Sequence, residues 1–158
     1  MPISIKLRVA GPDDLAVINA IRRDAILGIP PETGLRDAQA WADKRSPEFY
    51  AERLAAGSIV IASSRGCPIG WGSSDDDRIT GLYVRSSSGA VGVGRAIMSN
   101  LEVKILQRGH AYARLESSPN ALGFYIKLGY SQIGPAEADG AIPMRRHLAA
   151  VGLQAGNC

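Results

Sequence analysis

The stretch from Arg85 to Ala96 constrains the fold more than any other, because it joins an expected strand to an expected helix through glycines. A helix start leaves about four backbone N–H groups without intrahelical partners, and the aligned peptide dipoles place about half a positive charge there. The glycines at 89, 92 and 94 remove the Cβ atoms that would keep an anion away from this backbone. The stretch therefore predicts either an anion-binding cradle or a plain connecting turn, and its neighbours must decide between the two.

The residues before this turn have the pattern of a strand meander. Residues 58–63 form an apolar run, residues 67–73 form a second strand loosened by glycines, and residues 78–85 lead into the glycine turn. The adjacent carboxylates of residues 75–77 favour a solvated turn over a metal site, because no other ligand stands at suitable spacing. Such short connections predict antiparallel hairpins, which argues against the βαβ unit of a Rossmann dinucleotide site.

The residues after the glycine turn predict a helix, a strand and a second helix. Apolar side chains recur every fourth position from 93 to 105, which is typical of an amphipathic helix. Residues 110–117 alternate in polarity and predict a strand with Glu116 near the end of its polar face. Ser118-Pro119 supplies a cap and a first-turn proline for a further helix that ends at Gly129. Closing strands are expected at residues 130–133 and 141–148, with a loose tail at 149–158.

The N-terminal part begins with alternating residues 3–9, which predict a strand with one buried face. Helices are then expected at residues 12–28, 36–44 and 46–57. Helices and strands thus intermix along the whole chain. This mixture predicts an α/β (α+β) sandwich about a mostly antiparallel sheet.

The composition is that of one globular domain spanning residues 1–158, with 46% hydrophobic residues. The 18 basic residues are mixed with 15 acidic ones and form no run, so nucleic acid is not a favoured partner. Cys67 and Cys158 are too few for a disulfide framework or a metal site, which favours a reducing cytosol. The N-terminus lacks a signal-peptide core, and no stretch approaches the about 18 apolar residues that span a bilayer. We therefore expect a soluble, cytoplasmic protein without membrane contact.

Three motifs with consistent spacing carry a family resemblance. They are the strand Ile79 to Arg85, the glycine stretch Gly89-x-x-Gly92-x-Gly94, and the segment from Ser118 to Tyr130 with its Asn-Ala, Phe-Tyr and Gly-Tyr pairs. Together they resemble the GNAT superfamily of acyl-CoA-dependent N-acetyltransferases, over nearly the whole chain. The resemblance implies a GNAT-like fold, with a mixed, mostly antiparallel sheet splayed at its centre and flanked by helices. It also implies transfer of an acetyl group from acetyl-CoA to a primary amine, by direct attack through a tetrahedral intermediate.

The resemblance also implies how coenzyme A is held. The main chain before the glycine turn would bind the pantetheine arm like an added strand, and one amide there would support the oxyanion. The turn itself would hold the pyrophosphate. The implied cofactor-binding residues are Leu82, Tyr83, Val84, Gly89, Ala90, Val91, Gly92, Val93, Gly94, Arg95 and Asn120. Gly89 stands where the family usually has Gln or Arg, and Ala90-Val91 replace a glycine and a basic residue, so we expect a less electropositive cradle and weak cofactor affinity.

Tyr125 matches the family's general acid. A leaving thiolate has a thiol pKa of about 8.5 and a tyrosine hydroxyl about 10, so proton donation is feasible near neutrality. A core tyrosine with a satisfied hydroxyl is the alternative. Glu116 is the first candidate for the general base, directly or through water, with a charge pair to Arg114 or a neighbouring arginine as the alternative. Asn120 matches the asparagine near the cofactor sulfur, or is a polar helix-start residue, and His110 is expected to be structural.

The acceptor amine is expected between residues 27–50 and near residues 71–74, segments with several aromatic side chains and few acids. A polyamine or aminoglycoside site usually needs clustered carboxylates. Small-molecule amines, amino acids and peptide amines are therefore favoured. Two other functions stay open, an aminoacyl-tRNA-acetylating toxin and a non-catalytic acyl-CoA-binding sensor. No metal ion is expected, and a homodimer stays open.

Overall fold

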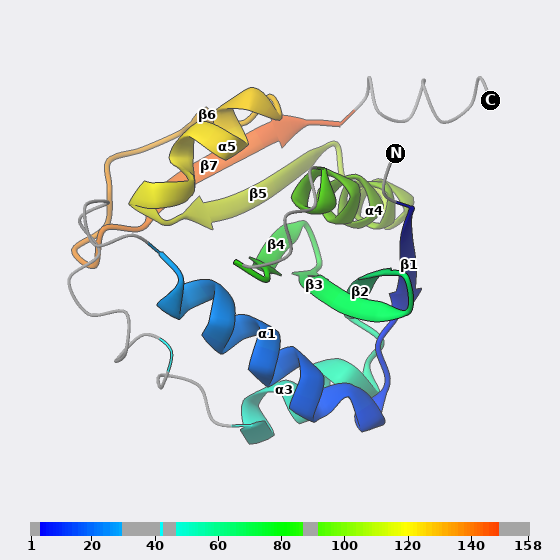
Figure 1. Ribbon diagram of the computed structural model, residues 1–158. Helices are drawn as coiled ribbons and strands as arrows, with labels where there is room; N and C mark the ends of the chain where they lie inside the picture. The colour runs from blue at the N-terminus through cyan, green and yellow to red at the C-terminus, as the bar shows by residue number, and fades with distance from the viewer. Residues whose placement is uncertain (1–3, 30–41, 43–46, 87–91, 149–158) are drawn as a thin grey trace.

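The computed structural model describes residues 4–29, 42, 47–86 and 92–148. Its strands and helices follow the expected order along the chain (Figure 1). They are β1 (Ile5–Val9), α1 (Leu15–Leu27), α3 (Pro47–Ala55), β2 (Ile59–Ser64), β3 (Cys67–Asp75), β4 (Arg78–Val84), α4 (Val93–Gln107), β5 (Tyr112–Ser117), α5 (Leu122–Lys127), β6 (Ser131–Gln132) and β7 (Ile142–His147). The 3-10 turns Pro12–Asp14 and Pro119–Ala121 precede α1 and α5. The expected tail at 149–158, and all of the expected helix at 36–44 except Ala42, lie outside the described residues.

The strands form one mixed sheet of seven, in the order β1-β2-β3-β4-β5-β7-β6. Every neighbouring pair is antiparallel except β4 and β5, which are parallel and are joined by α4 as a crossover. Within the described residues, β4 and β5 register only at Arg78 and Arg114, near the start of β4. The two strands part beyond this point, which confirms the expected mostly antiparallel sheet that opens at its centre.

The half of the sheet from β1 to β4 has helices on both faces (Figure 1). On one face, α4 packs against strand residues such as Val60 and Ile69. On the other face, α1 and α3 pack against Ile59, Ile61 and Trp71. Trp71 is 1% exposed, and its indole N–H donates to the Ile18 carbonyl oxygen at 2.9 Å. Trp71 is therefore a core residue, and its side chain is not exposed to an acceptor.

The half formed by β5, β7 and β6 buries one face only. Alternate residues of β5, Ala113, Leu115 and Ser117, are buried, while Tyr112 and Glu116 on the opposite face are exposed. This alternation agrees with the predicted period of two. The exposed face lies beyond the reach of α1 and α3, so it borders the place where β4 and β5 part (Figure 1).

The edge strand β1 differs from its expected pattern. Ile5 and Leu7 are only half-buried, and Val9 is 53% exposed, although the alternation predicts one fully buried face. The reason is position, because β1 pairs with β2 alone at the margin of the sheet. A helix that covers the middle of a sheet reaches its edge strand only in part.

Candidate active site

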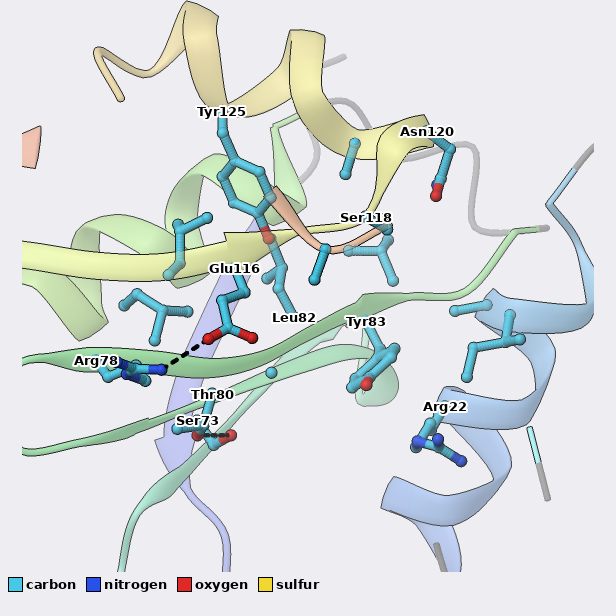
Figure 2. Close-up of a pocket in the computed structure, with 18 of the residues that line it drawn as sticks. Arg22, Ser73, Arg78, Thr80, Leu82, Tyr83, Glu116, Ser118, Asn120 and Tyr125 are labelled. Atoms are coloured by element: carbon cyan, nitrogen blue, oxygen red, sulfur yellow. Dashed lines mark hydrogen bonds and ion pairs between the residues drawn. The ribbon is translucent and has the colours of Figure 1, made fainter. Parts of the chain in front are cut away.

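A cavity of about 920 Å³ opens where β4 and β5 part. Its size suits a small-molecule ligand, since such sites usually measure about 300 to 1,000 Å³. Walls come from α1 and α3 on one side, from β4 along the floor, and from β5 and the turn before α5 on the other (Figure 2). The lining residues include the predicted Leu82, Tyr83, Val84, Glu116, Asn120 and Tyr125. The fold thus brings together six predicted residues from four separate elements, namely β4, β5, the 3-10 turn Pro119–Ala121 and α5.

Tyr125 is the buried residue of the short helix α5, with 8% of its surface exposed. Figure 2 shows its ring pointing from α5 toward β4, with the hydroxyl beside Leu82. Phe124 and Tyr130 contact the ring edge to face, with centroids 5.2 and 5.8 Å away, so its orientation is fixed by packing. None of the side-chain hydrogen bonds among the described residues involves the Tyr125 hydroxyl, and the residue lines the cavity, which leaves the hydroxyl available to a bound molecule.

The electrostatics of Tyr125 keep its hydroxyl protonated and make it a weaker acid than a free tyrosine. Burial, and to a lesser degree the nearby Tyr83, raises the pKa of the Tyr125 phenol above its usual value near 10. The hydroxyl therefore stays protonated throughout the neutral range. A group in this state can donate a hydrogen bond or a proton into the cavity, and it does not carry a charge there.

Glu116 lies at the end of the exposed face of β5 and is held by an ion pair. Arg78 Nη1 donates to Glu116 Oε1 at 3.0 Å, and the two side chains are 44% and 49% exposed (Figure 2). Of the alternatives for Glu116, a charge pair is thus present, with Arg78 as the partner. Arg114 pairs with Asp77 at 2.7 Å instead. Because Glu116 also lines the cavity, the ion pair sets the position of its carboxylate without removing it from the site.

The main chain of Leu82, Tyr83 and Val84 is paired with a neighbouring strand on one side and is unpaired with β5 on the other. β3 pairs with β4 along its length, with Gly70 opposite Val84 and Gly72 opposite Leu82. On the other side, the described residues of β5 meet β4 only near Arg78. Backbone N–H and C=O groups that face this opening can bind an extended ligand in the manner of an added strand.

The described part of the glycine turn begins at Gly92, and the predicted Gly89, Ala90 and Val91 lie outside it. Gly92 has φ of +91° and immediately precedes α4. This left-handed conformation is costly for residues with a Cβ atom, which explains the glycine. Among the described residues, no atom lies within 4 Å of the position a Cβ would take.

Gly94 has a packing role that its motif does not indicate. A Cβ at this position would lie 3.0 Å from the Phe124 ring, so the missing side chain allows α4 and α5 to approach closely. Val93 is buried and Arg95 is exposed, so a ligand here can meet the side chain of Arg95 but not that of Val93. A smaller hollow of about 240 Å³ lies at this contact, lined by Gly92, Gly94, Arg95, Phe124, Lys127 and Leu128.

Asn120 is exposed in the 3-10 turn before α5, on the Tyr125 side of the cavity (Figure 2). The expected serine cap is not formed, because Ser118 makes no side-chain hydrogen bond to the turn. The turn is instead shaped by Pro119 and by a backbone bond from the Ala121 N–H to the Ser118 carbonyl oxygen at 3.1 Å. Asn120 is thus an exposed residue that lines the cavity.

Two arginines of the cavity wall were not predicted from the sequence. Arg22 on α1 is 2% exposed, donates to the Ala42 carbonyl oxygen at 2.7 Å, and lies 5.7 Å from the centre of the Tyr83 ring. Arg53 on α3 lies 4.1 Å from the centre of the Phe49 ring. A signal for Arg22 exists, because it stands four residues after Ile18 and four before Ile26 on the inward stripe of its helix. A charged residue in such a stripe indicates a specific role.

Other sequence features have structural roles. His110 contacts Asp76 at 2.6 Å in the turn region before β4, away from the cavity lining. Across the described ranges, no set of three or more His, Cys, Asp or Glu side chains is placed to hold a metal ion. The described helices are too short or too polar to cross a membrane.

Comparison with known proteins identifies a family and a fold. The model of the acetyltransferase (GNAT) domain matches residues 23–147. A GCN5-related N-acetyltransferase from Rhodopseudomonas palustris is 25% identical, with a TM-score of 0.80 over 94% of this chain and 97% of that one. The PaiA N-acetyltransferase from Thermoplasma acidophilum, solved with coenzyme A, is 18% identical, with a TM-score of 0.72 over 91% and 99% of the two chains.

A third solved structure is yncA from Salmonella typhimurium, a protein described as a putative acetyltransferase and solved with acetyl-CoA. It is 20% identical, with a TM-score of 0.68 over 92% of this chain and 94% of that one. No curated protein sequence matches the chain. The family match covers most of the chain, and it agrees with the opened sheet and with the cavity beside Tyr125. The chain therefore belongs to the GNAT family of acetyltransferases, which are acyltransferases.

Proposed function

We propose that this chain transfers an acetyl group from acetyl-CoA to the primary amine of a small molecule, an amino acid or a peptide. The observation that carries the proposal is the meeting of three features in one cavity: the open edge of β4, the hydroxyl of Tyr125 and the carboxylate of Glu116. Each supplies one requirement of acyl transfer from a thioester, namely a place for the donor, an acid and a base.

The residues present fit coenzyme A. The open main-chain edge of Leu82 to Val84 suits the amide groups of a pantetheine arm. The start of α4 at Gly92 offers unpaired N–H groups to a pyrophosphate, with Arg95 exposed beside it. Asn120 stands at the mouth of the cavity on the Tyr125 side. The remaining proposed contacts, Gly89, Ala90 and Val91, complete the motif in the sequence.

Bound acetyl-CoA would supply the activated acetyl thioester, and the chain's residues would handle the protons. Glu116, directly or through water, receives a proton from the acceptor ammonium, so that the amine nitrogen can form a bond to the acetyl carbonyl carbon. The Tyr125 hydroxyl would give its proton to the thiolate that leaves when the thioester bond breaks. The second nitrogen proton restores Tyr125 through solvent, so the products are an amide, a free thiol and one proton held by Glu116.

The test is thiol release from acetyl-CoA across a panel of small amines, amino acids, peptides and aminoacyl-tRNA. The expected result is turnover that depends on an acceptor and exceeds thioester hydrolysis without one. Stabilisation by acetyl-CoA without turnover of any acceptor would support the sensor instead. Turnover confined to aminoacyl-tRNA, with strong salt dependence of binding, would support the toxin.

A further inference from the structure

The glycine turn is hydrogen-bonded to α1 at the point where the chain leaves β4. Ser86 is the last described residue before Gly92, and its backbone N–H and its hydroxyl both donate to Asp24 Oδ2, at 2.9 and 3.2 Å. Asp24 lies in the last turn of α1, 62 positions earlier in the sequence. A side chain of α1 thus fixes where the turn begins.

The same two segments also touch just beyond the end of α1. Gly28 follows the last residue of α1 and has φ of −83°, a value that any residue adopts. A Cβ at Gly28 would nevertheless lie 2.5 Å from Ser86 Cβ and 2.7 Å from Ser86 Oγ, closer than non-bonded atoms approach one another. The close approach of Ser86, and not the backbone conformation, therefore explains this glycine.

The chain is held from its other side by β3. The Arg85 N–H donates to the Ile69 carbonyl oxygen at 2.8 Å, and Arg85 Nε donates to the Pro68 carbonyl oxygen at 3.1 Å. Contacts to β3 and to α1 therefore hold the chain on two sides as it leaves β4. At the far end of the turn, the left-handed Gly92 leads directly into α4. Both ends of the turn thus have defined positions among the described residues.

The acid at position 24 needs an explanation other than direct contact with an anion. A carboxylate repels a phosphate, so Asp24 is not suited to bind a pyrophosphate itself. Its oxygen instead accepts two hydrogen bonds from the residue that begins the turn. Backbone N–H groups bind an anion more tightly when their turn is already in place, because less conformational entropy is lost on binding. Asp24 is therefore suited to prepare the turn for a ligand.

We propose that Asp24 and Gly28 are positioning residues for coenzyme A, which act on the pyrophosphate through Ser86 and the turn that it begins. The inference rests on the proposed function, because it takes this turn as the place of the pyrophosphate. Ala25 and Ile26 of the same helix line the cavity. One helix thus serves both as a cavity wall and as the support of the turn.

The first experiment measures the dissociation constant of coenzyme A by calorimetry in Asp24→Ala and Asp24→Asn. Both variants lose the same charge, but the amide keeps one oxygen, and both hydrogen bonds from Ser86 end on one oxygen. Loss of such bonds corresponds to about 5- to 10-fold in affinity. We therefore expect Asp24→Ala to bind coenzyme A more weakly than Asp24→Asn by this factor.

Pantetheine is the matched ligand, because it keeps the arm of coenzyme A and lacks the pyrophosphate. Its affinity, measured by competition, should be the same in Asp24→Ala and Asp24→Asn. A general loss of structure would weaken both ligands, whereas an effect through the turn weakens coenzyme A alone. The free energy of unfolding in urea is measured for each variant beside the two affinities.

Gly28→Ala supplies an independent variant with a steric rescue. Its Cβ must displace Ser86, so we expect a similar loss of coenzyme A affinity. Ser86→Gly in the same chain removes the two atoms that clash and keeps the N–H that donates to Asp24, so the double variant should recover part of the affinity. Gly11→Ala is the control and should bind like the parent, because no described atom lies within 4 Å of its Cβ position.

The outcomes separate this inference from the proposed function. Equal affinity of Asp24→Ala and Asp24→Asn for coenzyme A overturns the inference and leaves acetyl transfer standing. Parallel losses for coenzyme A and pantetheine, or a Gly28→Ala variant that binds like the parent, overturn it as well. A parent chain that binds neither coenzyme A nor acetyl-CoA overturns the proposed function itself.

Discussion

The two halves of the sheet are built in different ways. The half from β1 to β4 is antiparallel throughout and has helices on both faces, with α4 on one and α1 and α3 on the other (Figure 1). The half of β5, β7 and β6 buries one face and exposes the other. The packed half supplies the open edge of β4, while Tyr125 and Glu116 come from the less covered half. The cavity lies between the two halves, because the described residues of β4 and β5 pair only near Arg78 and part beyond it.

The less covered half packs on α4 through apolar side chains and is also joined to it by polar contacts. The Tyr130 hydroxyl donates to Glu102 Oε2 at 2.7 Å, and Arg146 Nη1 donates to the Glu102 carboxylate at 3.0 Å. Glu102 lies on α4 and is 2% exposed, whereas Tyr130 follows α5 and Arg146 lies on β7. Tyr130 also contacts the Tyr125 ring. The same network thus joins the two halves and supports the proposed acid, and the following predictions test this contrast.

The largest effect is expected from Tyr125→Phe, in the less covered half. The substitution removes one hydroxyl and keeps the buried ring, so we expect kcat to fall about 100-fold, a typical loss for a general acid. Affinity for acetyl-CoA, measured by calorimetry, and the free energy of unfolding should stay near the parent values. Parent and variant with equal turnover from about pH 6 to pH 9 would exclude this role, because Tyr125 stays protonated in that range.

Two glycine substitutions, one in each half of the molecule, compare how tightly the two halves are packed. A Cβ at Gly72 in β3 would lie 2.5 Å from Ile97 Cγ2 and 2.9 Å from Leu101 Cδ1. Overpacking of this kind should lower the free energy of unfolding of Gly72→Ala by about 2 kcal/mol in urea. Gly123→Ala in α5 is the control, because no atom lies within 4 Å of its Cβ position. Its stability should stay unchanged or rise by up to about 1 kcal/mol, and equal losses in the two variants would contradict the contrast.

Tyr130→Phe tests the polar attachment. The variant leaves the buried Glu102 carboxylate with Arg146 as its remaining partner, so we expect a loss of about 1 to 2 kcal/mol in the free energy of unfolding. Tyr112→Phe on the exposed face of β5 is the control, since the Tyr112 side chain is 39% exposed. We expect no measurable change in that control. Similar stability of Tyr130→Phe and the parent would show that apolar packing alone holds the half in place.

The smallest effect is expected at a surface ion pair beside the packed half. Hydrogen bonds from Arg8 at 2.8 Å, and less strongly from the Gly11 N–H, lower the pKa of Asp14 to about 2. A lowered carboxylate pKa stabilises the fold above the unfolded pKa of about 3.9 and loses this contribution as the pH falls through the folded value.

We therefore expect Asp14→Asn to lose up to about 1 kcal/mol at neutral pH, because the Arg8 side of the pair is solvent-exposed. The difference from the parent in urea unfolding should vanish as the pH approaches about 2. A difference that persists at low pH would mean that hydrogen bonding by the side chain, rather than its charge, matters at this helix start.

The sequence predicted the elements well where a local period carries the signal. The meander and α4 lie within a few residues of their expected ranges, and the alternation of β5 places Glu116 on the exposed face as predicted. The inward face of α5 likewise includes Tyr125. The sequence did not reveal packing roles that depend on a partner far along the chain. Trp71 is a core residue because α1 covers it, and Gly94 is explained by Phe124, about thirty positions later.

The sequence by itself determined the order of helices and strands, the glycine-rich helix start and the residues that match the GNAT motifs, because these follow from periodicity and from local backbone chemistry. Only the tertiary structure decided which side chains share the cavity. The pairing of Glu116 with Arg78 depends on where β4 and β5 part, and the position of Arg22 depends on how α1 lies across β4. Such contacts are set by sheet register and helix packing, which no short stretch of sequence contains.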